Sequence, residues 1–247
     1  MKTILITGAT AGFGEAAARK FVGGGWRAIG TGRRGERLKA LQEELGDAFL
    51  PLEIDMRNRD AVESLARLGP PWDGVDLLLN NAGLAPPTDP LPNTDWDRIE
   101  AVIDTNVTGL VALTRALLPK LIERKGQIIN LSSVAATYPY KGGAVYAGTK
   151  AFVRQFSLDL RADLAGTGVR VTSVEPGMAE TEFTIVRTGG DKQASDKLYA
   201  GMDPMTAEDL ADLFWWLANL PPRLNINTVE LMPVTQSFAG FTVSREG

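Results

Sequence analysis

Short apolar runs recur along the whole chain, and each is too short and too evenly apolar for an amphipathic helix. Runs of this kind are typical of strands that are covered on both faces. The pattern therefore predicts about seven buried strands. They are Thr3–Thr7, Arg27–Thr31, Phe49–Ile54, Val75–Leu79, Gln127–Leu131, Val169–Val174 and Thr228–Leu231.

The segments between these runs carry apolar residues at helical spacing. Glu36–Leu45 and Arg59–Leu68 are amphipathic, Trp96–Ile122 has apolar residues three or four positions apart, and Val145–Leu164 carries a stripe at spacing four. Alternating strands and helices predict a Rossmann-like, doubly wound parallel sheet with helices on both faces. Because no repeat or flexible linker divides the chain, we expect residues 1–247 to form a single domain.

The composition excludes several kinds of catalytic chemistry and says less about the fold. The 247 residues include no Cys and no His, which excludes disulfides, thiolate and imidazole catalysis and the usual zinc sites. A net charge of −4 without a long basic run argues against nucleic acid and anionic membranes as partners. No apolar segment approaches the ~20 residues that cross a bilayer, and the N-terminal run is too short for a signal peptide, so we expect a cytoplasmic protein.

The first strand leads into a glycine-rich turn, ILITGATAGFGEAAARKF. Gly8, Gly12 and Gly14 permit a tight turn and close approach of backbone N–H groups to a diphosphate. The spacing is G-x-x-x-G-x-G, which differs from the better known G-x-G-x-x-G fingerprint. An ordinary glycine-rich turn would have the same composition. We nevertheless predict a dinucleotide site, with Thr10 and Phe13 of the turn beside the cofactor.

The end of the second strand, IGTGRRGER, indicates which dinucleotide. Enzymes that use NAD place an acidic residue there for the ribose 2′-hydroxyl, whereas Arg accommodates a 2′-phosphate. No acid stands at positions 31 to 34, and Arg33 and Arg34 offer forked donors suited to phosphate. The sequence predicts NADP, the alternative being two solvated arginines at the start of a surface helix.

Tyr146 and Lys150 are one helical turn apart in GGAVYAGTKAF, among side chains too small to cover them. A nearby ammonium lowers the pKa of a phenol, so the pair predicts a general acid/base at neutral pH. A lone pair at this spacing also occurs in helices by chance. Ser132 and Ser133 end the preceding strand, where one hydroxyl is suited to hold a substrate oxygen, although such serines are often caps.

Two loops are longer than the rest, at residues 83–95 and 176–204. Long loops at the carboxyl ends of parallel strands grip ligands, so we predict a lid at about 177–204. A small buried carboxylate needs a local cation, and the lid supplies Arg187, which we expect to pair with an acidic substrate. A solvated lid arginine is the alternative.

Taken in order, TGATAGFG, NNAG, Asn106, the serine pair, YAGTK and EPG resemble the short-chain dehydrogenase/reductase family over the whole chain. The resemblance selects Ser133, thirteen residues before Tyr146, as catalytic. It implies that Lys150 holds the nicotinamide ribose and lowers the tyrosine pKa, and that Asn106 anchors a water-linked proton path. It also implies that Asp55 and Met56 flank adenine, that Asn81, Ala82 and Gly83 line the ribose, and that Pro176 and Gly177 border the nicotinamide. Glu175 departs from the Asn that is frequent in this family.

Further stretches, including KAFVRQFSLDLR, EPGMAETEFTIVRTGG and NINTVELMPVTQSFAGF, resemble the branch of NADP-dependent 3-hydroxy acid dehydrogenases that includes serine 3-dehydrogenase. This implies oxidation of L-serine, L-allo-threonine and acids of the 3-hydroxypropionate type, or reduction of the matching semialdehydes. A reductase of another small anionic aldehyde, such as sulfoacetaldehyde, is the alternative within the class. A non-catalytic sensor of the NADP(H) ratio is the alternative outside it.

The resemblance also implies a homotetramer, with Trp96–Ile122 and Val145–Leu164 at one interface. The aromatic residues at 214–216 and the tail Phe238–Val243 either fill the core or meet another subunit, and we expect core for most of them.

Overall fold

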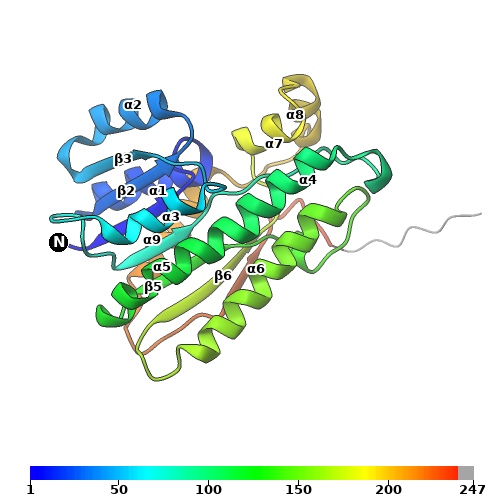
Figure 1. Cartoon of the computed structure of the whole chain (residues 1–247). Coiled ribbons are helices and arrows are strands. Elements are labelled where there is room, and N and C mark those ends of the chain that lie inside the picture. The colour runs from blue at the N-terminus through cyan, green and yellow to red at the C-terminus, as the bar shows by residue number, and fades with distance from the viewer. Residues whose placement is uncertain (239–247) are drawn as a thin grey trace, which may run out of the picture.

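A seven-stranded parallel sheet forms the centre of the molecule in the computed structural model, which describes residues 1–238 (Figure 1). The strand order is β3-β2-β1-β4-β5-β6-β7, with every neighbouring pair parallel. The strands are β1 (Thr3–Thr7), β2 (Arg27–Gly32), β3 (Phe49–Glu53), β4 (Leu77–Asn80), β5 (Gln127–Leu131), β6 (Arg170–Pro176) and β7 (Thr228–Leu231). This confirms the predicted fold class and every predicted strand, with small shifts at the ends.

Helices cover both faces of the sheet. One face carries α1 (Gly12–Gly23), α2 (Gly35–Leu45) and α9 (Ala207–Ala218), and the other carries α3 (Arg59–Ser64), α4 (Trp96–Ile103), α5 (Gly109–Glu123) and α6 (Ala144–Asp163). Each face has its own buried apolar cluster, because the strands are apolar on both sides. The order of the strands reverses direction between β1 and β4, and this is where doubly wound sheets bind ligands.

The aromatic residues at 214–216 divide between core and surface, as helical spacing requires. Phe214 is fully buried, Trp215 packs edge-on against Phe21, and Trp216 is 51% exposed. Phe238 is exposed and stacks on Tyr138, while residues 239–243 of the predicted tail lie outside the described residues. The expectation of core therefore holds for the first two of the three, and Trp216 and Phe238 are exceptions.

Residues Trp96–Glu123 form one long helical unit, α4 and α5 joined by a π-helical turn at Asp104–Thr108. This corrects the expectation that no apolar segment approaches the length of a membrane span, since the unit meets that criterion by length and composition. Half of its most apolar window is buried within the protein. Core helices of large sheets reach such hydropathy because they pack on strands and on other helices, as α5 does on α3.

The segment predicted as a lid loop contains two short helices, α7 (Glu182–Arg187) and α8 (Lys192–Tyr199). Thr181 caps α7 by accepting a hydrogen bond from Phe183 N, and Asp191 caps α8. The hydroxyls of Thr184 and Tyr199 form a hydrogen bond between the two helices, and Tyr199 also donates to the carbonyl of Ala179. The lid is therefore a folded helical pair rather than an extended loop.

Candidate functional site

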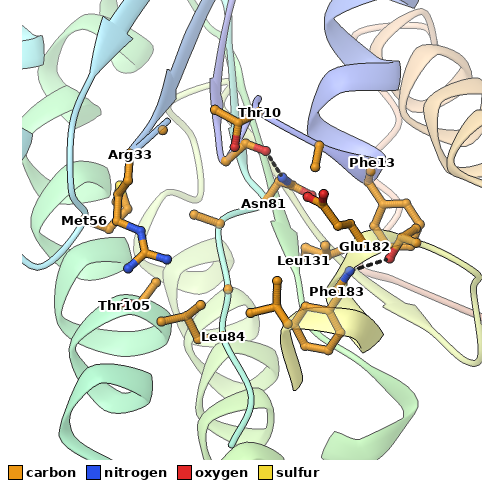
Figure 2. Close-up of a pocket in the computed structure, with 18 of the residues that line it drawn as sticks. Thr10, Phe13, Arg33, Met56, Asn81, Leu84, Thr105, Leu131, Glu182 and Phe183 are labelled. Atoms are coloured by element: carbon orange, nitrogen blue, oxygen red, sulfur yellow. Dashed lines mark hydrogen bonds between the residues drawn. The ribbon is translucent and has the colours of Figure 1, made fainter. Parts of the chain in front are cut away.

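A cavity of about 430 Å³ lies at the carboxyl ends of the central strands, under the lid (Figure 2). Its lining includes all but one of the residues assigned to the cofactor from the sequence, together with Ser133. The exception is Gly14, which packs against Gly8 and Asn81. Several further lining residues carry no motif in the sequence and were not predicted, among them Thr105, Leu131, Thr181, Glu182, Phe183 and Val186.

The glycine turn is packed too tightly for side chains. Gly8 has a positive φ of 71°, and a Cβ added at Gly14 would lie 2.3 Å from the carbonyl oxygen of Gly8. The N-cap residue of α1, Ala11, makes no side-chain capping bond. The first N–H groups of α1 are thus available beside the cavity, in an arrangement suited to a diphosphate.

The two arginines predicted to bind a 2′-phosphate have different surroundings. Arg33 extends into the cavity, and within residues 1–238 no hydrogen bond or ion pair engages it (Figure 2). Arg34 donates to the Thr10 hydroxyl and pairs with Glu182 of the lid at 2.6 Å. Arg33 is therefore the arginine whose donors are free for a phosphate.

The opposite wall is built from the segment after β4. Asn81 donates its side-chain amide to the carbonyls of Thr7 and Gly8, and Thr7 Oγ1 accepts from the backbone N–H groups of Asn81 and Ala82. These bonds fix the ends of β1 and β4 together where a nucleoside would lie. Asp55 and Met56 line the cavity beyond them, and the Arg57 guanidinium lowers the pKa of the Asp55 carboxyl.

Tyr146 and Lys150 come together at the cavity as their spacing in α6 predicts. Lys150 Nζ lies 5.7 Å from the centroid of the Tyr146 ring and donates to the carbonyl of Leu131 at 2.7 Å. Burial raises the pKa of Tyr146 to about 12, although a hydrogen bond with Ser133 and the charge of Arg187 act in the opposite direction. Burial also lowers the pKa of Lys150 to about 8.

The lowering of the tyrosine pKa by Lys150 stays a prediction, since the net pKa of Tyr146 in the protein alone is raised. Desolvation of the phenol outweighs every favourable charge, and the ammonium is directed at a backbone carbonyl rather than at the phenol oxygen. Lys150 still adjoins Gly83 and Asn106, since a Cβ added at Gly83 would lie 3.4 Å from its Nζ. Lys150 is thus placed to reach a sugar hydroxyl beside Gly83.

The two serines differ in what they contact. Ser132 Oγ donates to the carbonyl of Lys150 at 2.7 Å, which ties β5 to α6. Ser133, which lines the cavity as Ser132 also does, accepts from Ala135 N and donates to the carbonyl of Pro176 at 3.4 Å. The structure thus gives Ser132 a packing contact and leaves Ser133 near the tyrosine.

Asn106 lies in the π-helical turn and is 1% exposed. Its side chain accepts from Leu84 N at 2.8 Å and donates to Leu84 O and to the Thr149 hydroxyl. These partners satisfy the buried amide, and the proton-path role that the family resemblance implies for Asn106 stays a prediction. Asn106 links the helical unit to α6 and to the segment after Gly83, behind the cavity wall rather than in it.

The lid completes the site from above. Phe183 approaches the Tyr146 ring at 5.9 Å between centroids, and the Arg187 guanidinium lies 5.6 Å from the same ring. Arg187 donates to the Tyr140 hydroxyl at 2.8 Å, while its Nε is buried without a partner. Arg187 is therefore near the tyrosine with one donor unsatisfied, which is consistent with the predicted partner of an anionic substrate.

Glu175, the departure from the family pattern, is fully buried at the end of β6. It accepts from the Ser173 hydroxyl and pairs with Arg154 of α6 at 3.3 Å. Burial raises the pKa of its carboxyl, while Ser173 and Arg154 counteract this. The residue therefore connects the strand before Pro176 with the helix that carries Tyr146.

Comparison with known proteins gives one family. The family model for short chain dehydrogenase matches residues 2–190. A serine 3-dehydrogenase of Agrobacterium fabrum (strain C58) is 60% identical over 245 residues, which cover 99% of this chain and 98% of that enzyme. An NADP-dependent 3-hydroxy acid dehydrogenase of Salmonella typhi is 53% identical over 245 residues, with 98% and 99% of the two chains covered.

Comparison with solved structures gives the same family. The closed form of a serine dehydrogenase complexed with NADP⁺ superposes with a TM-score of 0.96 at 51% identity, covering 99% of this chain and all of the other. A serine dehydrogenase from Escherichia coli gives a TM-score of 0.83 at 48% identity and covers 95% of this chain and 99% of that chain. The predicted family resemblance is thus confirmed over nearly the whole length.

Proposed function

The chain belongs to the short-chain dehydrogenase family, and from this premise we propose that it is an NADP-dependent oxidoreductase acting on the hydroxyl of L-serine and related small 3-hydroxy acids. The reverse reaction reduces the matching semialdehydes. The observation that carries the proposal is the grouping of Ser133, Tyr146 and Lys150 at one cavity beneath a lid that brings in Arg187. The names of relatives at 53 to 60% identity support the same reading.

The cavity fits a dinucleotide phosphate. The glycine turn and the uncapped start of α1 suit the diphosphate, Arg33 suits the 2′-phosphate, and Asp55 and Met56 border the adenine end. Lys150, beside Gly83, suits the hydroxyls of the nicotinamide ribose. When bound, the cofactor accepts or supplies the hydride.

In the proposed mechanism the protein's own residues handle the proton and the charge. Ser133 holds the substrate oxygen, and Tyr146 takes the hydroxyl proton during oxidation or returns it during reduction. Lys150 adds a positive charge within about one helical turn of the phenol. Phe183 and Val186 of the lid cover the site and exclude water from it.

Arg187 is proposed to pair with the substrate carboxylate. The buried Nε without a partner and the position over the Tyr146 ring support this role, because an unpaired buried anion is costly. Replacing Arg187 by Met removes the charge while keeping an apolar side chain of similar length. We expect KM for the hydroxy acid to rise about tenfold or more with a smaller change in kcat. An unchanged KM with activity intact would exclude the role.

NADPH production with L-serine tests the function directly. Wild type should reduce NADP⁺, and Tyr146→Phe should lose at least about 100-fold in rate while still binding the cofactor. A panel of 3-hydroxy acids and semialdehydes, scored by kcat/KM with each cofactor, would identify the preferred acid. Preference for sulfoacetaldehyde would favour the alternative reductase. Cofactor binding without turnover on any of them would favour a sensor of the NADP(H) ratio.

Assembly and compartment are extensions of the same proposal. We propose a single domain with its lid at about 177–204, a homotetramer and a cytoplasmic location. Exposed apolar side chains on the helices expected at the interface support the tetramer: Trp96 is 70% exposed, Ile103 42% and Phe152 40%. Light scattering in solution tests the oligomeric state.

A further inference from the structure

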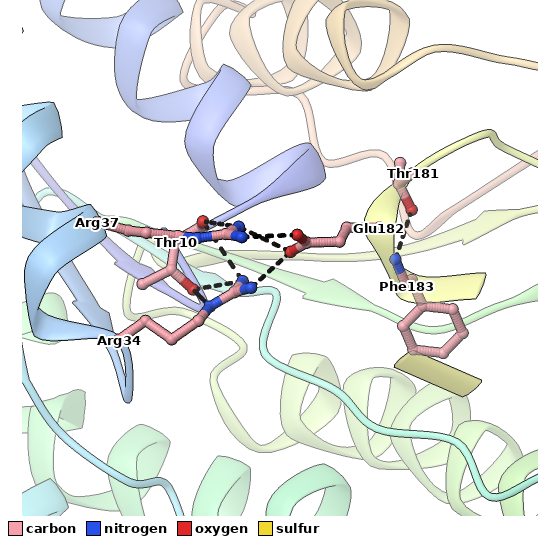
Figure 3. Close-up of polar contacts among 6 residues, drawn as sticks. All are labelled: Thr10, Arg34, Arg37, Thr181, Glu182 and Phe183. Carbon is pink, nitrogen blue, oxygen red and sulfur yellow. Dashed lines mark hydrogen bonds and ion pairs between the residues drawn. The ribbon is translucent and has the colours of Figure 1, made fainter. Parts of the chain in front are cut away.

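An acidic side chain from the lid reaches across the mouth of the cofactor cavity to two arginines at the start of α2 (Figure 3). Glu182 Oε2 accepts from Arg34 at 2.6 Å and from Arg37 at 2.9 Å, and Oε1 accepts from Arg37 at 2.8 Å. Glu182 is the first residue of α7, and its partners lie 148 and 145 positions earlier in the chain. These contacts join the lid to the part of the molecule that surrounds the adenosine end of the cavity.

The same arginines hold the glycine turn. Arg34 donates to the Thr10 hydroxyl from both Nε and Nη2, and Arg37 donates to the Thr10 carbonyl at 3.4 Å. The residue next to Glu182, Thr181, rests on the turn, because a Cβ added at Gly12 would lie 3.3 Å from the Thr181 Cβ. The lid, the glycine turn and α2 are thus connected through one network of charged and polar groups.

From this network we infer that Glu182, with Arg34 and Arg37, is a latch that holds the lid closed over the cofactor. The inference rests on the proposed function for the identity of the ligand beneath the lid. Glu182 touches neither cofactor nor substrate in the proposed mechanism, so it is a positioning residue. Its helix carries Phe183 and Arg187 to the Tyr146 ring, and the latch therefore sets the placement of both.

The latch also separates the roles of the two predicted phosphate-binding arginines. The donors of Arg34 are engaged by Thr10 and Glu182, whereas Arg33 reaches into the cavity without a hydrogen bond or ion pair in the described part of the chain. Arg33 selects the 2′-phosphate, and Arg34 fastens the lid. Hydrogen bonds from Arg37 and Arg34 lower the pKa of the Glu182 carboxyl, so the latch carries its negative charge at neutral pH.

The side chains of Glu182, Arg34 and Arg37 are 30%, 41% and 48% exposed, so each pair is screened by solvent. Because the Glu182 carboxylate accepts from two arginines through both of its oxygens, we expect a stabilisation at the upper end of the range for exposed ion pairs. We expect loss of the latch to raise the equilibrium constant for lid opening about fivefold. This corresponds to about 1 kcal/mol, because a tenfold change corresponds to about 1.4 kcal/mol. The effect should shrink in about 0.5 M salt, because screening weakens the pairs.

Two single variants and their combination test the latch. Glu182→Gln and Arg37→Met should each raise the dissociation constant of NADP⁺ and KM for the hydroxy acid about fivefold, with kcat within about twofold. The double variant should be no worse than Glu182→Gln alone, because Glu182→Gln already removes the ion pair that Arg37→Met removes. Glu44→Gln is the matched control: Glu44 also pairs with an arginine, Arg19, through two contacts of 2.8 Å, but outside the cavity lining.

Hydrogen exchange separates the latch from the proposed function, because it needs no cofactor. In the protein without added ligand, backbone amides of 181–190 should exchange faster in Glu182→Gln and Arg37→Met than in wild type or Glu44→Gln. Faster exchange in a protein that fails to bind NADP⁺ would sustain the latch and refute the function. Unchanged exchange in Glu182→Gln overturns the latch, and so does tighter NADP⁺ binding, which would show that Glu182 competes with the phosphate for Arg34.

Discussion

A single methyl group at Gly14 should disrupt the glycine turn, because the space for it is already taken by backbone. An added Cβ would lie 2.3 Å from the carbonyl oxygen of Gly8 and 2.6 Å from the side-chain nitrogen of Asn81. Neither neighbour can move alone, since Asn81 holds the carbonyls at the end of β1. Overpacking costs about 1–3 kcal/mol, and contact with backbone places this case at about 3 kcal/mol. For a chain of this size we expect the melting temperature to fall by about 6–12 °C.

Gly23 in the same helix provides the control. It is exposed, and an added Cβ meets no atom within 4 Å, so Gly23→Ala should stabilise the protein by about 0.5–1 kcal/mol through helix propensity. Thermal unfolding followed by circular dichroism gives both shifts, and titration with NADP⁺ shows whether Gly14→Ala also weakens cofactor binding. If Gly14→Ala has the same melting temperature as Gly23→Ala and binds NADP⁺ as tightly as wild type does, the close-packed turn is not required and the reasoning fails.

Three further predictions concern separate parts of the site. Arg33→Ala should reduce the preference for NADP⁺ over NAD⁺ about 10- to 100-fold in kcat/KM, the range of one charge-assisted contact, and an unchanged preference would place the 2′-phosphate elsewhere. Asn106→Leu should lower the free energy of unfolding by about 1–3 kcal/mol in urea, because it leaves the half-buried N–H and C=O of Leu84 without their Asn106 partner; a loss below about 0.5 kcal/mol would contradict this. Burial raises the pKa of the Glu175 carboxyl above its ordinary 4.5, so the folded protein favours the protonated form of this residue. The free energy of unfolding therefore falls as pH rises through the folded-state pKa, where the buried carboxyl must ionise. Glu175→Gln should therefore raise the melting temperature at about pH 8 and have little effect at about pH 4, and a shift independent of pH would refute the assignment.

The sheet was predictable because its strands are buried on both faces and therefore apolar throughout. All seven runs became strands, and the ends moved by at most a few residues, as at β6, which extends to Pro176. The sequence predicts the buried face of helix α9 less clearly, since Phe214 is core while Trp216 on the same turn is exposed. The lid helices α7 and α8 are not predictable from the sequence, because each is short and depends on tertiary contacts such as the one between Thr184 and Tyr199.

The site divides in the same way into local and non-local parts. Tyr146 and Lys150 are one turn apart on a helix, so their spacing alone brings them to the same wall. The partnership of Glu182 with Arg34 spans 148 positions and follows from no local pattern. The burial of a side chain also depends on distant parts of the chain. It raises the pKa of Tyr146, whereas the nearby lysine alone predicts a lower pKa. The sequence thus reveals which groups meet within one helix, but not which distant groups pair or how strongly each is desolvated.

The shifted pKa values of Tyr146 and Lys150 have a consequence for the two directions of the reaction. With a pKa of about 12, Tyr146 is protonated at neutral pH and is already the acid that reduction needs, whereas oxidation needs the phenolate. Lys150, with a pKa of about 8, retains most of its charge at neutral pH and loses it above. In the proposed mechanism, oxidised nicotinamide bound near Tyr146 would add positive charge and lower the pKa of the phenol during oxidation only.

We therefore expect kcat/KM for oxidation to rise with pH between about 6 and 9, and kcat/KM for reduction to stay level over the same range. Both profiles can be measured by NADPH absorbance with one hydroxy acid and its semialdehyde. The Tyr146→Phe variant, measured in parallel, shows whether any pH dependence belongs to the phenol. An oxidation profile that is flat from about pH 6 to 9 would mean that the phenol already ionises below that range, contrary to the desolvation that its burial imposes.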